Sequence, residues 1–536
     1  MARTSSSTWW KHAVFYQIYP LSFADSNGDS FGDLQGLIAK LDYLSGILGV
    51  DALWLSPFFK SPMKDWGYDV SDHTDIDPTF GTLDDARQLV DEAHSRGLKV
   101  VIDYVINHTS DEHPWFKESR SSRDNPKRDW YVWRDGRSEG EPPTNWISVF
   151  SGPAWSFDDA TGQWYRHTYL SEQPDLNWRN PEVVEAMFDV ARFWLDLGVD
   201  GFRVDAAHQM MKDPEERDNP PAPPDYPRPY KDMGEYDGLI HLYDFGHPDV
   251  HDMHRELRKV TESVDREILT VGEVHIFDLP EWASYYGENF DQLSMPFNFQ
   301  LMTADWNVPS LRAIIEAVLW NVPVGGWTNW TLGNHDEIRL ATRLPEGHTG
   351  LAALLLLTMR GTPFLYYGDE LGMRQVAVSQ SDSRDPWGHN VEWLSRDGAR
   401  TPMQWSAQPN AGFTAEGVVP WLPIDPGYST INVDTELEDP DSTLNLYRRL
   451  LQLRREHSAL RIGSFLTHPS STEEVFAYRR ESDSETMTVV LNFSDEERSV
   501  EVGRGDIVFS TLDRNRLGRC RAEVGLASRE GIVISH

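Results

Sequence analysis

Three acidic residues stand where three short apolar segments of the sequence end. Asp205 lies in GFRVDAAH, Glu273 in VGEV and Asp336 in GNHD. Two carboxyl groups about 5 to 5.5 Å apart can cleave a glycosidic bond with retention, one attacking the anomeric carbon and the other protonating the leaving oxygen. A single acid at a strand end is more often a helix cap or an ion-pair partner. The chemistry therefore requires elements that bring these carboxylates together.

Eight short β-branched and aromatic runs alternate with amphipathic stretches such as LDDARQLVDEAHSRG. The runs occupy residues 13–20, 50–57, 99–108, 199–207, 268–274, 292–299, 327–335 and 362–371. Eight alternations predict an α/β fold, a (β/α)8 TIM barrel. Polar residues gather at the C-terminal ends of the runs, the face on which barrel active sites lie. Because neighbouring strands are about 4.8 Å apart, Asp205 and Glu273 can flank one bond.

The remaining segments predict additions to the barrel, which takes residues 1–108 and 176–462. Residues 109–175 are rich in Trp, Gly, Pro and charge and lack helical periodicity, so they predict an inserted domain after the third strand. Alternating runs in 463–536 predict a C-terminal antiparallel β domain that stabilises rather than catalyses. The proline-dense segment 212–230 predicts an extended, stiff loop beside the site or, alternatively, a solvated linker.

Composition limits the classes of function. The chain has 536 residues, 39% of them hydrophobic, and a net charge of -36, which disfavours nucleic acid as a partner and fits either ordinary solubility or a saline environment. The apolar run 351–359 is too short to span a membrane and predicts a buried barrel helix. A single cysteine, Cys520, and a start without the apolar run of a signal peptide predict a cytoplasmic protein. The oligomeric state stays open.

Seven motifs follow one another between residues 13 and 372: GVDALWLSP, DYVINH, QPDLN, GFRVDAAH, VGEV, LGNHDEIR and GTPFLYYGDE. They resemble the ordered signature regions of the α-amylase superfamily, glycoside hydrolase family 13, and the match is highly specific. The resemblance implies that Asp205 is the nucleophile and Glu273 the general acid/base. It implies that Asp336 binds sugar hydroxyls and stabilises an oxocarbenium-like transition state.

The resemblance also implies which residues bind substrate. Arg203 precedes Asp205 by two, so both side chains point to one face of a strand and the guanidinium can hold the nucleophile ionised; a purely structural ion pair is the alternative. In the family's exo-acting glucosidases, an Asp and a Tyr, here Asp65 and Tyr68, close the pocket around a terminal glucose, and an arginine matching Arg400 pairs with that Asp. The full predicted set is Asp65, Tyr68, His108, Phe150, Tyr169, Gln173, Arg203, His335, Arg339 and Arg400.

The segment DSNGDSFGD at 25–33 places oxygen donors at alternate positions. The predicted ligands are Asp25, Asn27, Asp29, the carbonyl of Phe31, and Asp33. Hard oxygen ligands at this spacing suit Ca²⁺ or Mg²⁺, although such a cluster is also ordinary turn chemistry. The resemblance favours a structural ion remote from the reaction, and no organic cofactor is expected.

The phrases SPMKD, NHTSDEHPWF and RTPMQW resemble the oligosaccharide-processing branch of the family. Ala206, the residue after the nucleophile, accompanies α-1,4 rather than α-1,6 cleavage there. We therefore expect a retaining, exo-acting α-glucosidase that hydrolyses small α-glucosides such as maltose, with transglucosylation left open by two departures, Tyr169 and Glu337. A trehalose synthase or a sucrose- or isomaltose-active enzyme is the alternative. A non-catalytic barrel scaffold is disfavoured, because all three carboxylates are kept.

Overall fold

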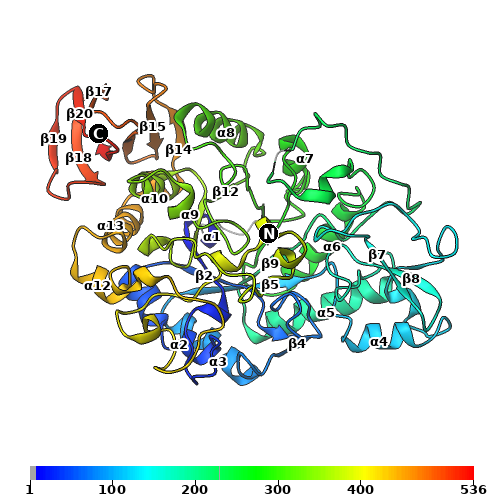
Figure 1. Cartoon of the computed structure of the whole chain (residues 1–536). Coiled ribbons are helices and arrows are strands. Elements are labelled where there is room, and N and C mark those ends of the chain that lie inside the picture. The colour runs from blue at the N-terminus through cyan, green and yellow to red at the C-terminus, as the bar shows by residue number, and fades with distance from the viewer. Residues whose placement is uncertain (1–7, 229) are drawn as a thin grey trace.

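An eight-stranded parallel sheet, curled into a barrel, forms the centre of the computed structural model, which describes residues 8–228 and 230–536 (Figure 1). The strand order is β11-β10-β9-β5-β2-β1-β13-β12. The bounds are β1 Phe15–Ile18, β2 Ala52–Leu55, β5 Lys99–Val105, β9 Gly201–Asp205, β10 Leu269–Gly272, β11 Met295–Pro296, β12 Asn329–Thr331 and β13 Thr362–Tyr366. All eight predicted runs contain a barrel strand, so the predicted TIM-barrel fold class is confirmed.

Helices between the strands surround the barrel. These helices include α2 Leu34–Ile38, α3 Leu83–Ser95, α5 Pro181–Leu197, α6 Val250–Glu262, α7 Leu279–Ser284, α8 Val308–Asn321, α10 Thr349–Thr358 and α13 Thr443–Glu456. Thr82 and Asp85 close the first turn of α3 with a reciprocal capping box. Every residue of α10 from Leu351 to Thr358 is buried, which confirms the buried barrel helix. In the described part of the chain, no helix is long and apolar enough to cross a membrane.

Short elements complete the loops of the barrel. They are the helices α1 Trp9–His12, α9 Leu340–Arg343, α11 Pro386–Asn390, α12 Val433–Glu438 and α14 Ser458–Ile462, and the hairpin of β3 Phe59–Lys60 with β4 Asp72–Ile76. Helix α11 and the turn after it carry part of the site described below. The long connection after β13 therefore contributes residues to the site.

A buried amide joins the two ends of the curled sheet. Asn329, on β12, donates from Nδ2 to the carbonyl of Pro296 on β11 (2.7 Å), and its Oδ1 accepts the amide of Asn298 (3.0 Å). The side chain of Asn329 is fully buried. Since β11 has only two residues, this amide substitutes for the backbone hydrogen bonds that a longer strand would make.

The inserted segment 109–175 carries a small antiparallel sheet in the order β6-β8-β7, with β6 Trp133–Arg134, β7 Trp155–Asp158 and β8 Gln163–Arg166. It also contains a helix, α4 Pro114–Ser121. The sequence did not predict this helix, because the segment lacks helical periodicity. His113 caps its first turn by accepting the amide of Trp115, and Pro114 opens it. A capped helix of two turns is too short to show a clear period.

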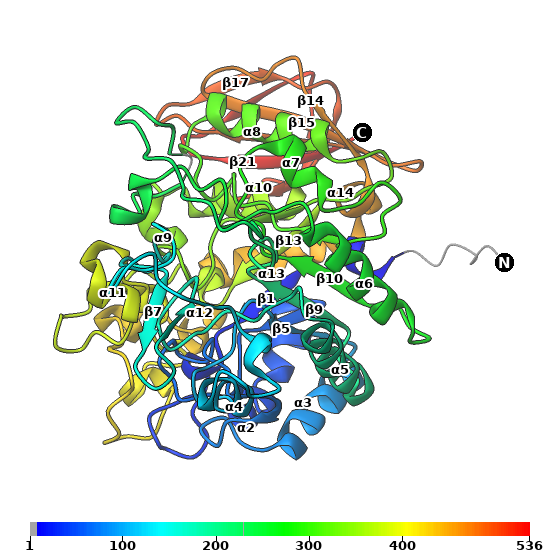
Figure 2. The same cartoon turned by 90° about the vertical axis from the view of Figure 1, so that its right-hand side faces the viewer.

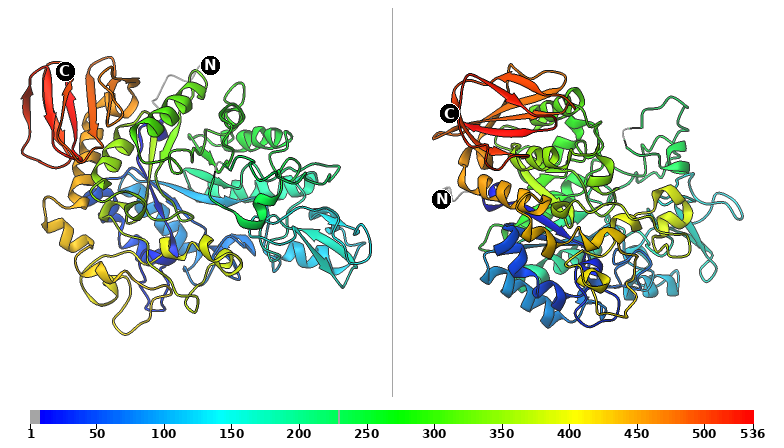
Figure 3. Two further views of the ribbon diagram at one scale, coloured as in Figure 1. Left: turned by 45° about the horizontal axis from the view of Figure 1, so that its top comes forward. Right: turned by 60° about the vertical axis from the view of Figure 1, so that its left-hand side comes forward.

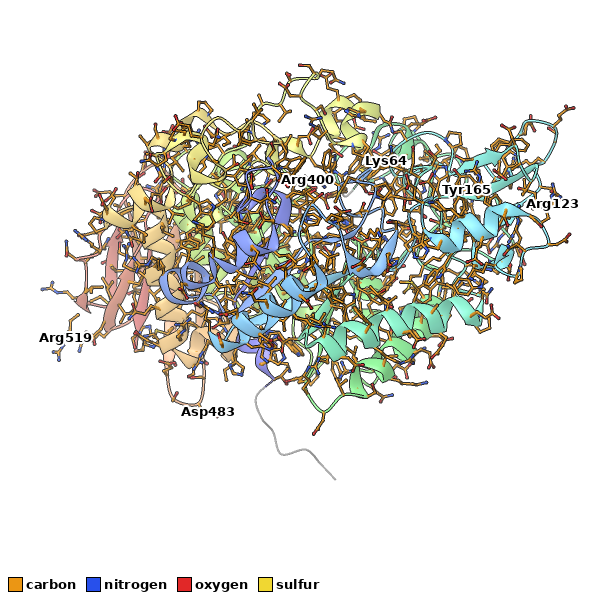
Figure 4. The ribbon with its side chains drawn as sticks, turned by 90° about the horizontal axis from the view of Figure 1, so that it is seen from below. Lys64, Arg123, Tyr165, Arg400, Asp483 and Arg519 are labelled. Carbon is orange, nitrogen blue, oxygen red and sulfur yellow. The ribbon has the colours of Figure 1, made fainter. Side chains whose placement is uncertain are left out.

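The C-terminal segment forms antiparallel sheets, ordered β14-β15-β16-β21-β18-β19 and β17-β20. The bounds are β14 Ser464–Thr467, β15 Val475–Glu481, β16 Thr486–Asn492, β17 Arg498–Glu501, β18 Gly505–Ser510, β19 Gly518–Cys520, β20 Glu523–Leu526 and β21 Gly531–Ser535. Figure 2 shows these strands beside α8 and α10. Viewed from below, Arg519 and Asp483 lie at the end of the molecule opposite Arg123 and Tyr165 of the inserted segment (Figure 4). This separation leaves the barrel mouth to the insertion and the barrel loops.

We expect Asn329→Ala to lower the free energy of unfolding by about 2 to 5 kcal/mol, because it leaves a buried carbonyl and a buried amide unpaired. Urea titration followed by circular dichroism measures the change. Asn321→Ala is the control, since Asn321 bonds only its own helix at the carbonyl of Ala317. Equal losses in the two variants would show that the amide between β11 and β12 does not close the barrel.

Candidate active site

The three predicted catalytic carboxylates lie on one cavity of about 770 Å³. Asp205 ends β9, Glu273 follows β10 directly, and Asp336 follows β12. Gly272 allows β10 to reach this point, because a Cβ at its position would lie 2.4 Å from Cδ1 of Leu293. Their placement at the C-terminal ends of strands matches the active face of barrels.

One buried guanidinium holds the carboxylates of β5, β9 and β10 together. Nη1 of Arg203 lies 2.8 Å from Oδ1 of Asp103 and 2.5 Å from Oδ1 of Asp205. Nη2 of Arg203 lies 2.9 Å from Oε2 of Glu273. Asp103 stands opposite Arg203 in the register of β5 with β9. Arg203 therefore contacts both predicted catalytic acids, whereas a purely structural ion pair would involve Asp205 alone.

Three carboxylates around one cation retain net negative charge, which affects their protonation. Burial, with repulsion from Glu273 and Asp103, raises the pKa of Asp205 well above its usual value. Burial also raises the pKa of Asp103, to about 6. Burial opposes ionisation of Glu273, yet Arg203 and His275 lower the pKa of that group. Asp205 and Glu273 therefore titrate as a pair that shares protons.

Ala206 has a backbone conformation that few residues with a side chain adopt. Its φ is 44°, in the left-handed region, where a non-glycine residue costs about 1 to 3 kcal/mol. In this conformation its amide donates to Oε2 of Glu273 (2.8 Å). The turn after Asp205 thus holds the carboxylate of Glu273 in place.

Asp336 is held by two arginines from one turn that follows α11. Its Oδ1 lies 2.9 Å from Nη2 of Arg400 and 3.3 Å from Nη1 of Arg396. Burial acts to raise the pKa of Asp336, but His335, Arg396 and Arg400 lower it well below its usual value. Asp336 is therefore ionised and suited to stabilising positive charge.

The predicted pairing of Arg400 with Asp65 is wrong, because Arg396 makes that contact. Nη2 of Arg396 lies 2.8 Å from Oδ1 of Asp65 and 2.6 Å from Oδ1 of Asp385. Arg400 instead bonds Asp336 and donates from Nε to the carbonyl of His335 (2.9 Å). Asp385 is the physical reason, since this fully buried carboxylate orients Arg396 toward Asp65. Figure 4 shows Arg400 among the interior side chains.

The predicted pocket histidines are neutral donors or acceptors. Burial lowers the pKa of His335 to about 3 and that of His108 to about 4. The hydroxyl of Tyr68 lies 2.7 Å from Nε2 of His335, and the two rings are parallel with centroids 5.4 Å apart. Gln173 donates to Oδ2 of Asp65 (3.1 Å). These side chains form a continuous hydrogen-bonded wall.

Aromatic rings adjoin this wall. Phe150 stacks on Trp387 with ring centroids 5.1 Å apart, and Tyr169 meets His108 edge-on at 5.3 Å. Arg339, predicted to bind substrate, lies outside this cavity lining. It is buried, donates to the carbonyl of Tyr367 (2.7 Å) and lies over that ring. Its motif position misled the prediction because the chain turns away after Asp336.

The segment 212–230, as far as the structure describes it, lies beside the site without regular secondary structure. Tyr226, Pro227 and Arg228 line the cavity. Just beyond, Lys231 lies 2.9 Å from Oε1 of Glu337 and donates to the carbonyl of Asp336 (3.0 Å). The charge of Glu337 is thus paired with Lys231, which bonds this loop to the segment after β12. Figure 3 shows the inserted segment, in cyan, on the side of the barrel away from the C-terminal strands, in red.

The loop at 25–33 is closed by its own hydrogen bonds. Asp25 accepts the amides of Gly28 and Ser30, and Asp33 accepts the amide of Gly36 and so caps α2. Within the described residues, no group of three His, Cys, Asp or Glu side chains is arranged to hold a metal ion. Carboxylate and amide oxygens on one turn nevertheless have the donor chemistry that Ca²⁺ or Mg²⁺ takes.

Several site residues escaped the sequence analysis. They are His275, Lys231, Asp385, Trp387 and Arg396. The signal for Arg396 was present in SRDGARTPMQW, which holds two arginines four residues apart, but nothing in the sequence says which of them meets Asp65. His275 stands two residues after Glu273, so strand alternation could have placed it on the same face.

Comparison with known proteins gives consistent matches. The alpha-amylase catalytic domain model matches residues 17–463. An oligo-1,6-glucosidase of Parageobacillus thermoglucosidasius is 41% identical over 91% of this chain and 91% of its own length. A probable alpha-glucosidase of Rhizobium meliloti is 41% identical over 92% and 91%. The crystal structure of an alpha-glucosyl transfer enzyme, XgtA, superposes with a TM-score of 0.91 at 39% identity, covering 99% of this chain and 100% of that one.

We expect Arg396→Ala to lower kcat/KM on an aryl α-glucoside by roughly 100-fold or more, because Asp65 and Asp336 lose the cation that holds them in place, and the loss of one preorganised electrostatic group costs about 100- to 1,000-fold in rate. Arg396→Lys recovers little, since one ammonium cannot bridge Asp65, Asp385 and Asp336. Steady-state kinetics measure both variants. Arg384→Ala, an exposed neighbour, is the control, and equal activity of Arg396→Ala and this control would refute the assigned contact.

Proposed function

Because the chain belongs to the α-amylase family of glycoside hydrolases, we propose that it is a retaining, exo-acting α-glucosidase. The observation that carries the proposal is the bridge from Asp205 through Arg203 to Glu273. One guanidinium spans both carboxylates, which suits the short spacing of about 5 to 5.5 Å in retaining enzymes better than the wider gap of inverting ones. The proposed substrates are small α-glucosides.

The residues divide the reaction into two steps. In the state of the Asp205–Glu273 pair that has the shared proton on Glu273, Asp205 attacks the anomeric carbon while Glu273 donates its proton to the leaving oxygen, which breaks the glycosidic bond and forms a glucosyl ester on Asp205. Glu273, now a carboxylate, then removes a proton from water. The water oxygen attacks the anomeric carbon, the ester bond to Asp205 breaks, and α-glucose is released. Asp336 stabilises the positive charge that develops on the sugar ring in both steps.

Exo action is supported by a buried ion pair in the lining of the cavity. Asp65 and Arg396 form a buried pair there, with Tyr68 and Gln173 beside it. A charge-assisted pair of this kind hydrogen-bonds sugar hydroxyls and leaves no passage for a longer chain. A single terminal glucose is therefore the unit we expect to be recognised.

The proposed linkage preference is α-1,4, as in maltose, and it depends on the small side chain of Ala206 beside Asp205. A second candidate is α-1,6 cleavage, favoured by the 41% identical relative named oligo-1,6-glucosidase. The name of the 39% identical XgtA similarly favours transfer of glucose to acceptors other than water. A cytoplasmic location stays a prediction.

Separate incubation with maltose, isomaltose, sucrose and trehalose, followed by proton NMR, tests the proposal. We expect α-glucose to be released first, and fastest from maltose, with Asp205→Asn as an inactive control that keeps the volume of the nucleophile. β-Glucose as the first product would refute retention. Faster release from isomaltose would transfer the assignment to the α-1,6 candidate, and trehalose formed from maltose would indicate a synthase.

We also propose that the loop 25–33 binds Ca²⁺ or Mg²⁺ through the five predicted donors. If so, EDTA should lower the melting temperature by a few degrees, because an ion bound at 100 times its Kd contributes about 2.7 kcal/mol. Differential scanning calorimetry with and without added Ca²⁺ measures the effect. Asp29→Asn should be insensitive to EDTA, whereas an unchanged melting temperature of the unsubstituted protein would contradict the ion site.

A further inference from the structure

Glu273 has a close neighbour that the proposed reaction does not use. Nε2 of His275 lies 3.0 Å from Oε1 of Glu273. Both residues line the cavity, and His275 comes from the segment directly after β10. A group that bonds the carboxyl of the acid/base acts on the proton that this residue transfers.

The two oxygens of Glu273 have different surroundings. Oε2 accepts the amide of Ala206 at 2.8 Å and lies 2.9 Å from Nη2 of Arg203. Oε1 meets His275 instead. Because two donors stabilise charge on Oε2, Oε1 is the oxygen left to carry the transferable proton. His275 therefore contacts the oxygen that matters for proton transfer.

The ring of His275 is held in place by aromatic neighbours. It stacks on Phe299 with centroids 4.4 Å apart and an angle of 14°, and Tyr230 lies on it at 5.4 Å. Its side chain is 27% exposed. Phe299 is itself buried in the barrel core. Turning the imidazole away from Glu273 would break these contacts.

The other nitrogen of the ring indicates which one carries the proton. Nδ1 of His275 is buried and has no hydrogen-bond partner in the described part of the chain. An N–H there would be an orphaned donor, which is rarer in proteins than an orphaned acceptor. The favoured tautomer thus has the proton on Nε2, which donates it to Oε1 of Glu273.

We propose that His275 is a positioning residue for Glu273 that favours its carboxylate form and sets the alkaline limit of turnover. The proposal rests on the role of Glu273 under the proposed function. Other titratable or charged groups face Glu273 from β5, β9, the insertion, the loop after β9 and the β12 end: Asp103, Arg203, Asp205, Tyr169, His208, Tyr230 and Asp336. Of these, Arg203 also contacts the carboxyl group, but on the other oxygen.

The electrostatics give the sign of the effect. Burial acts to raise the pKa of Glu273, while Arg203 and then His275 lower it. Loss of His275 therefore raises this pKa, so the protonated acid persists to higher pH and the alkaline limb moves upward. The carboxylate that must activate water in the second step becomes less available on the acid side, near the raised pKa. The two half-reactions should change in opposite directions.

His275→Leu and His275→Gln, measured from acid to alkaline pH on p-nitrophenyl α-glucoside, test the proposal. For His275→Leu we expect the alkaline limb of kcat/KM to move up by about one pH unit, so that kcat/KM on that limb rises about tenfold. For His275→Gln, whose amide nitrogen reaches the position of Nε2, we expect the limb to return. His251→Gln is the control, since His251 bonds Gln292 and lies outside the cavity lining.

An alkaline limb that stays fixed in His275→Leu, or that moves equally far in His275→Gln, would overturn the proposal and leave His275 a packing residue. Circular dichroism confirms folding, and His275→Asn, too short to reach Oε1, replaces the leucine variant if that one unfolds and should show the same shift. An unsubstituted protein inert on every α-glucoside would instead refute the proposed function. The two failures are therefore distinguishable.

Discussion

The contact of Arg203 with three carboxylates is the constraint on which the rest of the site depends. A buried carboxylate without a partner costs several kcal/mol, so Asp103, Asp205 and Glu273 can converge only around a cation. Strands β5 and β9 supply Asp103, Arg203 and Asp205 in register, and Glu273 directly follows β10, the next strand of the sheet. The barrel thus brings three neighbouring strand ends, and the carboxylates at them, to one guanidinium.

A second network of similar design lies across the cavity. There the acids Asp65, Asp336 and Asp385 surround Arg396, with Arg400 bonded to Asp336. Tyr68 joins the two networks, because its hydroxyl lies 3.1 Å from Oδ2 of Asp103 and 2.7 Å from His335. The substrate-facing acids are therefore held by buried partners on both sides, and little reorganisation is needed when charge develops.

The parts of the molecule that repeat a local rule could be predicted from sequence. Apolar runs ending in polar residues gave the eight strands, and motif order gave the three carboxylates. The helix α4 escaped because two turns show no period, and the Arg396–Asp65 contact escaped because it joins residues 331 positions apart. A choice between two arginines in one turn is decided by Asp385, whose influence is visible only in three dimensions.

The division between strands and loops also bears on which reaction products form. Proteins named oligo-1,6-glucosidase and alpha-glucosyl transfer enzyme are 41% and 39% identical to this chain, so similar sequences carry names that imply different fates of the glucosyl group. That fate depends on what lies beyond Glu273 when water or another hydroxyl approaches. In this chain that region is formed by loop residues such as Tyr230, Tyr236 and Phe277, together with His275. The strand ends of the barrel thus carry the candidate catalytic carboxylates, and the loops above them form the remaining lining of the cavity.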